Sequence, residues 1–434
     1  MIRAVLCVAV AVGCVPSQTE LRRPVESDVA RRLGGEVALD ARIAPLLAKP
    51  LDRDSAVRIA LANSSRLRAE LTALGVAGGE LASALGLGPL NIDASVRFGS
   101  GGAYEFEVEA IQNVLGLVTA PRARTGARAN LEAARARASA AILELVARVE
   151  IAFTDLIAAQ QEIELRRTAF DAADAAALVR ERMHAAGNTS DLALARDRDA
   201  REQARVDLAR SEADVEVARE RLNALLGLSG DQTKWTAAAA LAELPGTAPQ
   251  LDDLEQAAVA ASLELAAGRA SIEGAANHLG AERVRAWLPE FGIGAAVVEH
   301  GAGIEVGPAV RLGIPLFDQR GAERAKATAA LARAEHELSA TAIELRAGAR
   351  AARIMALTAH QEARHLREII LPLRQQIVDQ TLLHYNAMDA DPFELIVARR
   401  QLAEAGHQYL DALRRYWNSI SEVTALRRGV MLSH

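Results

Sequence analysis

The chain has 434 residues, a net charge of −6 at pH 7 and an apolar fraction of 50%, yet only 3% of its residues are aromatic. Its length allows two or three domains, and its mild acidity without a basic tract argues against a nucleic-acid-binding protein. Much of the apolar content is alanine in long runs with arginine and glutamate, which is typical of extended helices. Beyond the N-terminus no run of 18 apolar residues occurs, so no transmembrane helix is predicted for the mature chain.

Residues 1–14 are predicted to be an export signal, because a short basic start precedes an apolar stretch. The run Ala11–Cys14 resembles a bacterial lipobox, which makes Cys14 the predicted lipidation site; the alternative is an ordinary cleaved signal peptide. Cys7 is lost on cleavage, so no disulfide can form within the mature chain. By analogy with bacterial lipoproteins, Val15 after the cysteine favours the outer membrane.

The next segment, 15–50, contains prolines and a glycine pair and is predicted to be an N-terminal tether or equatorial segment with one short helix. A helix is predicted from Leu51 to about Leu87, with Asp52 or Asp54 as its N-cap. The Gly88-Pro89 pair ends it.

A strand hairpin is predicted over Leu90–Ile111. Apolar residues alternate there with polar ones, and the run Gly99–Gly102 supplies the turn. Strand side chains have a period of two, so each strand has one apolar and one charged face. The hairpin is either half-buried on a soluble core or a membrane hairpin with a lipid face and a wet face, since transmembrane strands run about 9–11 residues.

Two long helices are predicted next, over Arg122–Ala186 and Thr189–Leu226, separated by a glycine-asparagine stop. Both carry apolar and alanine residues at alternating spacings of three and four. A 3.5-residue repeat makes helices supercoil around neighbours, so both are predicted to be coiled-coil helices.

The second half of the chain repeats the first. Residues 258–265 restate 60–67, strands are predicted over 291–312, and a long helix runs from after Pro315–Asp318 to about His384 before a last helix. Pro372 is predicted to interrupt and bend the long helix. The predicted organisation is: signal peptide 1–14, N-terminal segment 15–50, first repeat 51–228, inter-repeat equatorial linker 229–249, second repeat 250–428 and C-terminal tail 429–434.

Several phrases, in this order, resemble the TolC-like outer-membrane efflux protein family, over essentially the whole chain from Leu51 to Arg428. They are Ala56–Leu67, Arg182–Arg196, Leu222–Leu228, Val310–Glu335 and Tyr409–Trp417. The last phrase is similar to the C-terminal helix of the heavy-metal efflux branch.

The resemblance implies a mainly α fold with a membrane β part. Each protomer of a homotrimer would give four strands to one twelve-stranded β-barrel and coiled-coil hairpins to an α-helical barrel in the periplasm. Physical chemistry agrees with an oligomer, because four strands cannot close a barrel and an open edge in lipid leaves backbone groups unsatisfied. The apolar strand residues Leu90, Ile92, Val96, Phe98, Tyr104, Phe106 and Val108 would then face lipid.

The implied function is a passive outer-membrane channel, the exit duct of a tripartite efflux system for drugs or heavy-metal cations. Its implied partners are a periplasmic adaptor protein, an inner-membrane pump and the lipid bilayer. A type I protein-secretion duct and a periplasmic coiled-coil adaptor are the alternatives. No enzyme constellation, cofactor site or P-loop is predicted, and the scattered histidines, including His360 and His365, do not form a metal site.

Two sets of site residues are predicted. The two helix turns reverse the chain, and the resemblance implies that they also form the closed gate and dock the adaptor. These turn residues are Gly187, Asn188, Thr189, Ser190, Asp191, Tyr385, Asp389, Asp391 and Pro392. We hypothesise that Asp389 and Asp391 ring the entrance and favour cations. Arg180, Arg182 and Tyr385 are candidate partners in a latch that holds the gate. Capping and solvation explain the same residues equally well.

The second set consists of acidic strand residues that would make the channel lumen acidic: Asp93, Glu105, Glu107, Glu109 and Glu305. They outnumber Arg97 and Arg311. The alternative is that they are solvated strand residues without a role in selectivity.

Overall fold

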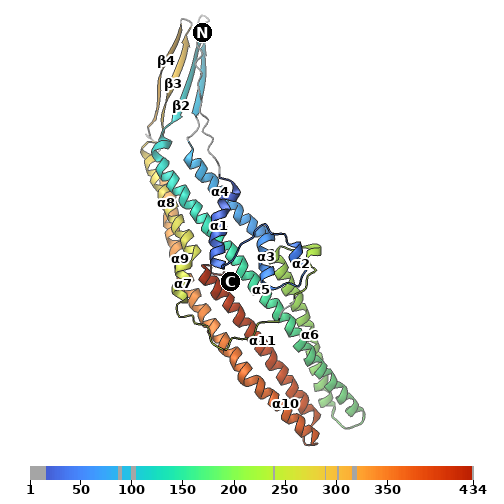
Figure 1. The fold of residues 1–434 in the computed structure, drawn as a ribbon. Helices are drawn as coiled ribbons and strands as arrows, with labels where there is room; N and C mark the ends of the chain where they lie inside the picture. The colour runs from blue at the N-terminus through green and yellow to red at the C-terminus, as the bar shows by residue number, and fades with distance from the viewer. Residues whose placement is uncertain are drawn as a thin grey trace. The chain divides into compact units, whose positions relative to one another are not determined.

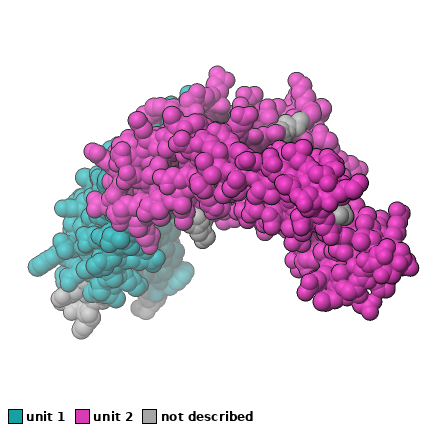
Figure 2. Space-filling view, turned by 90° about the horizontal axis from the view of Figure 1, so that it is seen from below, with its two compact units in different colours: residues 1–28, 69–139, 263–343 teal, residues 29–68, 140–262, 344–434 magenta. Residues whose placement is uncertain are grey.

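The computed structural model describes residues 16–86, 90–98, 104–237, 240–288, 290–300, 303–314 and 320–432. Cys14, the Gly99–Gly102 turn and the Pro315–Asp318 passage lie outside them. The chain forms two compact units, coloured separately in Figure 2. Unit 1 comprises 1–28, 69–139 and 263–343, and unit 2 comprises 29–68, 140–262 and 344–434. Each unit therefore combines segments from both predicted repeats, whose boundaries stay predictions.

The same order of elements occurs in both halves of the chain (Figure 1). The first half contains α1 (Gln18–Leu33), α2 (Ala44–Leu47), α3 (Arg53–Asn63), α4 (Ser65–Leu85), β1 (Leu90–Phe98), β2 (Tyr104–Asn113), α5 (Leu115–Ala185) and α6 (Asp191–Leu226). A short 3₁₀ turn, η1 (Gly230–Thr233), follows. The second half contains α7 (Leu254–Ala261), α8 (Leu263–Trp287), β3 (Glu290–His300), β4 (Gly303–Gly313), α9 (Gly321–His365), the π-helical turn η2 (Leu366–Ile370), α10 (Leu371–Asn386) and α11 (Pro392–Arg428). In both, helices precede a strand pair and two further helical segments follow, as the duplication predicted. None of the described helices is both long and apolar enough to cross a membrane.

The four strands form one antiparallel sheet in the order β1-β2-β3-β4. Both predicted strand pairs are confirmed, and β2 of the first half pairs along its length with β3 of the second, for example Val108 with Val297. The sheet in unit 1 is thus built from both halves of the chain.

The helix predicted over 51–87 is wrong in one respect, because it breaks at Ser64. This residue has extended backbone angles (φ −65°, ψ 112°), and its hydroxyl accepts a hydrogen bond from the Leu67 N–H at 3.3 Å. Ser64 therefore ends α3 and caps α4. Ser262 makes the same break between α7 and α8, with φ −59° and ψ 122°.

The start of α5 also differs from the prediction. α5 begins at Leu115 instead of Arg122, because the Asn113 side chain accepts from the Leu115 N–H at 3.0 Å and caps the helix there. Pro121 therefore lies inside α5 instead of before it. In the N-terminal segment α1 is 16 residues long, and its buried face is Leu21, Val25 and Val29 at a spacing of four.

The interruption predicted at Pro372 takes the form of the π turn η2. Proline lacks the N–H that would bond to the carbonyl four residues earlier. Just before it, the Leu371 N–H donates to the Leu366 carbonyl five residues back, which is π-helical geometry. α9 and α10 therefore follow one another through a local change of hydrogen bonding.

Unit 2 holds two apolar clusters. The first joins α3, α5 and α6 through Leu51, Ile59, Val149, Phe153, Leu156, Val215, Leu222, Leu226 and Trp235. The second joins α9 and α11 through Ala359, Ala363, Ala412, Leu413 and Tyr416. In Figure 1, α5 with α6 and α10 with α11 form two helical hairpins in this unit. In the second cluster, alanines lie where α9 and α11 meet, and their small side chains let these helices approach closely.

Candidate functional site

The sheet places all five predicted acidic strand residues on one face. Side chains of directly paired residues lie on the same side of a sheet. Asp93 pairs with Glu109, and Ser95 with Glu107. The same face includes Glu105 opposite Arg97, and Glu305, which pairs with Val298, the partner of Glu107 on β3.

The two arginines of this face are paired with carboxylates. Arg97 contacts Glu105 at 3.4 Å and Glu107 at 2.9 Å. Arg311 on β4 reaches Asp93 on β1 at 3.1 Å and Glu109 on β2 at 3.2 Å. Its side chain must cross β3, where its paired residue is Gly292.

A sixth carboxylate, Glu290, lies 4.0 Å from Arg311 and was missed by the sequence analysis, which began the strand at Phe291. Glu290 continues the alternation of apolar and polar residues in this strand, one position before Phe291. Among the described residues this face therefore carries six carboxylates and two arginines, so it is net acidic.

The opposite face of the sheet is apolar and exposed. Most of its large side chains are 38–85% exposed: Leu90, Ile92, Val96, Phe98, Tyr104, Phe106, Ile293, Val297, Ile304, Val306, Val310 and Leu312. Val108 and Phe291 belong to the same face and are half-buried. Contiguous apolar surface of this extent marks a face that contacts another protein or a membrane. An ordinary soluble core, the alternative considered for this hairpin, would cover it.

The turn between α5 and α6 is a Schellman turn in unit 2. Gly187 is left-handed (φ 77°), and the Asn188 N–H donates to the Met183 carbonyl at 2.8 Å. The Ser190 hydroxyl then caps α6 by accepting from the Ala193 N–H at 3.2 Å.

The turn between α10 and α11 repeats this geometry. Met388 is left-handed (φ 60°), and the Asp389 N–H donates to the His384 carbonyl at 2.9 Å. Asp391 caps α11 by accepting from the Phe393 N–H at 2.9 Å. The Asp389 carboxylate also lies 3.0 Å from His384 Nδ1, so both predicted acidic residues have local partners.

Arg180 brings the two turns together. Its Nε donates to Asp197 at 2.5 Å and its Nη1 to Thr189 at 3.2 Å, while its guanidinium lies 3.2 Å from the centroid of the Phe393 ring. It therefore joins α5, α6 and the start of α11. Arg180 was predicted as a latch partner but Phe393 was not, because no local pattern pairs residues 213 positions apart.

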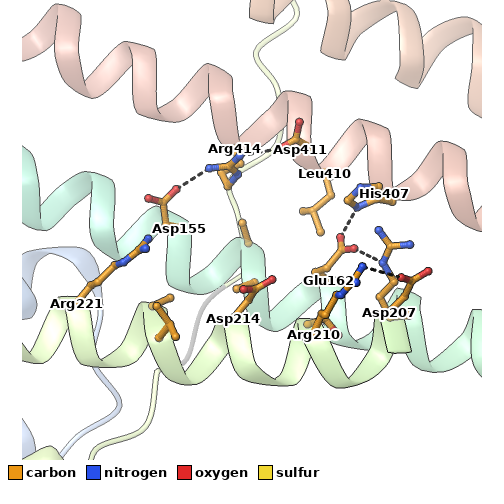
Figure 3. Close-up of a pocket in the computed structure, with 16 residues that line it drawn as sticks. Asp155, Glu162, Asp207, Arg210, Asp214, Arg221, His407, Leu410, Asp411 and Arg414 are labelled. Carbon is orange, nitrogen blue, oxygen red and sulfur yellow. Dashed lines mark hydrogen bonds and ion pairs between the residues drawn. The ribbon is translucent and has the colours of Figure 1, made fainter. Parts of the chain in front are cut away.

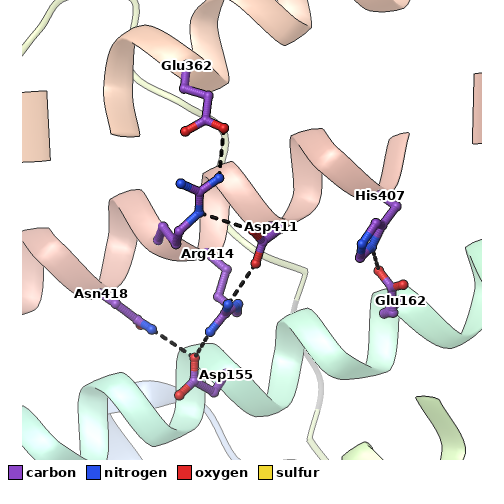
Figure 4. A network of polar contacts seen from close by, with 8 residues as sticks. Asp155, Glu162, Glu362, His407, Asp411, Arg414 and Asn418 are labelled. Atoms are coloured by element: carbon purple, nitrogen blue, oxygen red, sulfur yellow. Dashed lines mark hydrogen bonds and ion pairs between the residues drawn. The ribbon is translucent and has the colours of Figure 1, made fainter. Parts of the chain in front are cut away.

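A charged cavity of about 480 Å³ lies between α5, α6 and α11 (Figure 3). Figure 4 shows the ion pairs that join α11 to α5 and α9 on one side of this cavity. Asp155 on α5 accepts from Arg414 at 3.1 Å and from Asn418 at 2.8 Å. His407 lies 2.6 Å from Glu162, and a further ion pair joins Arg415 to Glu362 of α9 at 2.8 Å. These contacts fix the last helix against the long helices of both halves.

In this network Asp411 has a lowered pKa. Burial alone would raise the pKa of its carboxyl, but the hydrogen bond from Arg414 and the positive charges of Arg414 and Arg415 outweigh burial and hold it below its usual value of 3.8. Burial raises the pKa of the neighbouring Tyr416 hydroxyl.

Asp411→Asn is expected to destabilise the protein by about 1 kcal/mol at pH 7, a small cost because the carboxylate is 38% exposed and water screens it. A carboxyl whose pKa is lowered on folding contributes stability above its unfolded pKa and loses it as the pH falls through the folded pKa. The difference in melting temperature between wild type and variant should therefore be largest at pH 7 and should disappear below about pH 4. Asp231→Asn, at an exposed pair with Lys234, is the control; an equal gap at all pH values would contradict the prediction.

Within the described part of the chain, no group of three or more His, Cys, Asp or Glu side chains is placed to hold a metal ion. Most of the charged side chains that line the cavity in Figure 3 form ion pairs with one another.

No protein-family model matches the sequence, and no curated protein does. Solved structures match most of it. A membrane protein from Pseudomonas aeruginosa aligns with 87% of this chain and 90% of its own, at 17% identity and a TM-score of 0.71. The outer membrane protein VceC from Vibrio cholerae aligns with 87% and 96%, at 15% identity and 0.71. The CmeC outer membrane channel of Campylobacter jejuni aligns with 88% and 87%, at 14% identity and 0.70. The chain has the TolC-like fold of outer-membrane channels.

The phrases that suggested the TolC-like fold lie at its structural joints. Arg182–Arg196 spans the α5–α6 turn, and Leu222–Leu228 spans the end of α6, where Gly227 is left-handed (φ 67°). Tyr409–Trp417 contains Asp411, Arg414 and Tyr416, which make the ion pairs and packing of α11. The residues of this last phrase are thus held by contacts within unit 2.

Proposed function

We propose that the chain is a passive channel through the outer membrane and the exit duct of a tripartite efflux system. The observation that carries the proposal is the sheet with one exposed apolar face and one acidic face, in a fold that the chain shares with outer-membrane channels. The apolar face would contact lipid and the acidic face would line the lumen. A periplasmic adaptor and an energised inner-membrane pump would supply the driving force, and no reaction would be catalysed.

The working form is a homotrimer in this proposal. Among the described strands, β1 and β4 lie at the edges of the sheet, and unsatisfied backbone groups at a sheet edge cost several kcal/mol each in lipid. Three copies would close a barrel of twelve strands. The N-terminal cysteine, Cys14, would be acylated and hold each copy at the outer membrane.

Deleting the gene tests the proposal directly. A deletion strain should become sensitive to drugs or to heavy-metal cations and recover with the wild-type gene on a plasmid; which group of compounds responds identifies the cargo. Loss of a secreted protein without such sensitivity would favour the type I secretion duct.

The purified protein provides the second arm of the test. A trimer that needs detergent and shifts on heating in gels is expected. A monomer that stays soluble without detergent after removal of residues 1–20 would favour the periplasmic adaptor and contradict the channel.

Asp389→Asn combined with Asp391→Asn is expected to lower the cation-to-anion permeability ratio of single channels roughly twofold. The reason is that each of the three copies would lose two negative charges at the entrance. Asparagine caps a helix as well as aspartate does, so α11 should keep its start. Reversal potentials in a KCl gradient across a planar bilayer measure the ratio, with Asp231→Asn as control. An unchanged ratio would sink the idea that these residues favour cations.

A further inference from the structure

The two helix turns of unit 2 have the same backbone hydrogen bonds but different residues at the left-handed position. In each, the N–H after the left-handed residue donates to a carbonyl five positions back, from Asn188 to Met183 and from Asp389 to His384. The left-handed residue is Gly187 in the first turn and Met388 in the second. The fold therefore accepts glycine at this position, and the second turn has methionine instead.

Methionine is unfavourable there for two separate reasons. A Cβ atom is crowded by the backbone in the left-handed conformation, which is why glycine is usual at such a position. The Met388 side chain is also 95% exposed, so no packing within the chain offsets the strain. A strained backbone that the rest of the fold does not require is a reason to look for function.

The surroundings of Met388 indicate what would cover it. Asp389 follows directly, with its side chain 73% exposed, and Asp391 and Glu394 come next along the start of α11. An unbranched apolar side chain thus projects from an acidic rim. Methionine is flexible and suits contacts with protein pockets. A pocket complementary to this turn would be apolar, narrow and rimmed by lysine or arginine.

We propose that Met388 is the anchor by which the second turn, and not the first, seats in an apolar, basic-rimmed pocket on the periplasmic adaptor. This inference rests on the proposed function. In protein interfaces a few buried residues contribute most of the binding energy, and we assign that role here to Met388. The first turn, with Gly187, would contribute shape alone.

Three substitutions at this position separate binding from folding. Met388→Gly removes the side chain and the strain together, so the melting temperature of the purified protein should stay equal or rise while binding weakens about tenfold or more. Met388→Gln keeps length and strain but loses apolar character, and should also impair export. Met388→Leu keeps an apolar side chain and should retain most of the export activity.

The measurement is the minimum inhibitory concentration of the compounds to which the deletion strain is sensitive, with equal amounts of each variant in the outer membrane. For Met388→Gly it should fall roughly fourfold or more, toward the deletion value, and for Met388→Leu it should stay within about twofold of wild type. A purely structural methionine predicts the opposite, because glycine would improve the turn.

The two possible failures are distinguishable. A deletion strain with no sensitivity would contradict the proposed function itself. A sensitive deletion strain in which Met388→Gly restores wild-type resistance would leave that function standing and overturn the role of Met388.

Discussion

Replacing Gly294 with alanine is expected to break the pairing of β2 with β3 and to destabilise the sheet by about 3 kcal/mol. A Cβ atom at Gly294 would collide with the backbone carbonyl of Ala110 and approach the Ile111 Cα to 2.8 Å. These are main-chain atoms of the neighbouring strand, so no side-chain rotation can relieve the clash. The strands must separate, and the ladder of hydrogen bonds between the two halves of the chain is lost locally.

Gly307→Ala is the matched control, because Gly307 is also a strand glycine but has nothing within 4 Å of an added Cβ. The measurement is the melting temperature of the purified protein, followed by circular dichroism. We expect the melting temperature of Gly307→Ala to be close to that of wild type, and the melting temperature of Gly294→Ala to be well below both. Equal melting of the two variants would contradict the close approach of β2 and β3.

The second large effect is expected for Glu282→Ala in α8. Glu282 is only 3% exposed; it accepts from Arg285 at 2.6 Å and lies 3.0 Å from Arg320, just before α9. Removing the carboxylate leaves two guanidinium groups facing one another across a buried site. Because both arginines are about a third exposed, we expect a cost of about 2 to 3 kcal/mol.

Arg320 also has a left-handed backbone (φ 52°), so the lost ion pair should loosen the N-terminal end of α9 first. Limited proteolysis near residue 320 and a thermal melt report the two effects. Glu337→Ala, which removes the exposed partner of Arg333 on α9, should leave both unchanged. A Glu282→Ala variant as resistant to protease as wild type would show that the ion pair does not hold the start of α9.

Much of the fold follows from periodicity in the sequence. Alternation of apolar and charged residues predicted all four strands and the face on which Asp93 and Glu305 lie. The spacing of alanine and leucine predicted the long helices. The break at Ser64 was missed because a single serine is compatible with a helix, and its capping role depends on the turn that the backbone makes around it.

The sites were predicted less completely, for reasons of distance and conformation. The contacts of Arg311 with Asp93 and of Arg180 with Phe393 join residues far apart in the sequence, so local patterns carry no trace of them. The left-handed backbone at Met388 was also unforeseen, because turn signals rest on glycine and asparagine and neither residue stands there.

The pairing of β2 with β3 has a consequence for the order of folding. Asp93 and Arg311, which meet across the sheet, are 218 positions apart, and contacts of such long sequence separation form slowly. Before the second half of the chain is available, the first hairpin has an apolar face and an unpaired β2 edge, both of which promote aggregation. We therefore expect newly made chains to need a holding chaperone until β3 arrives.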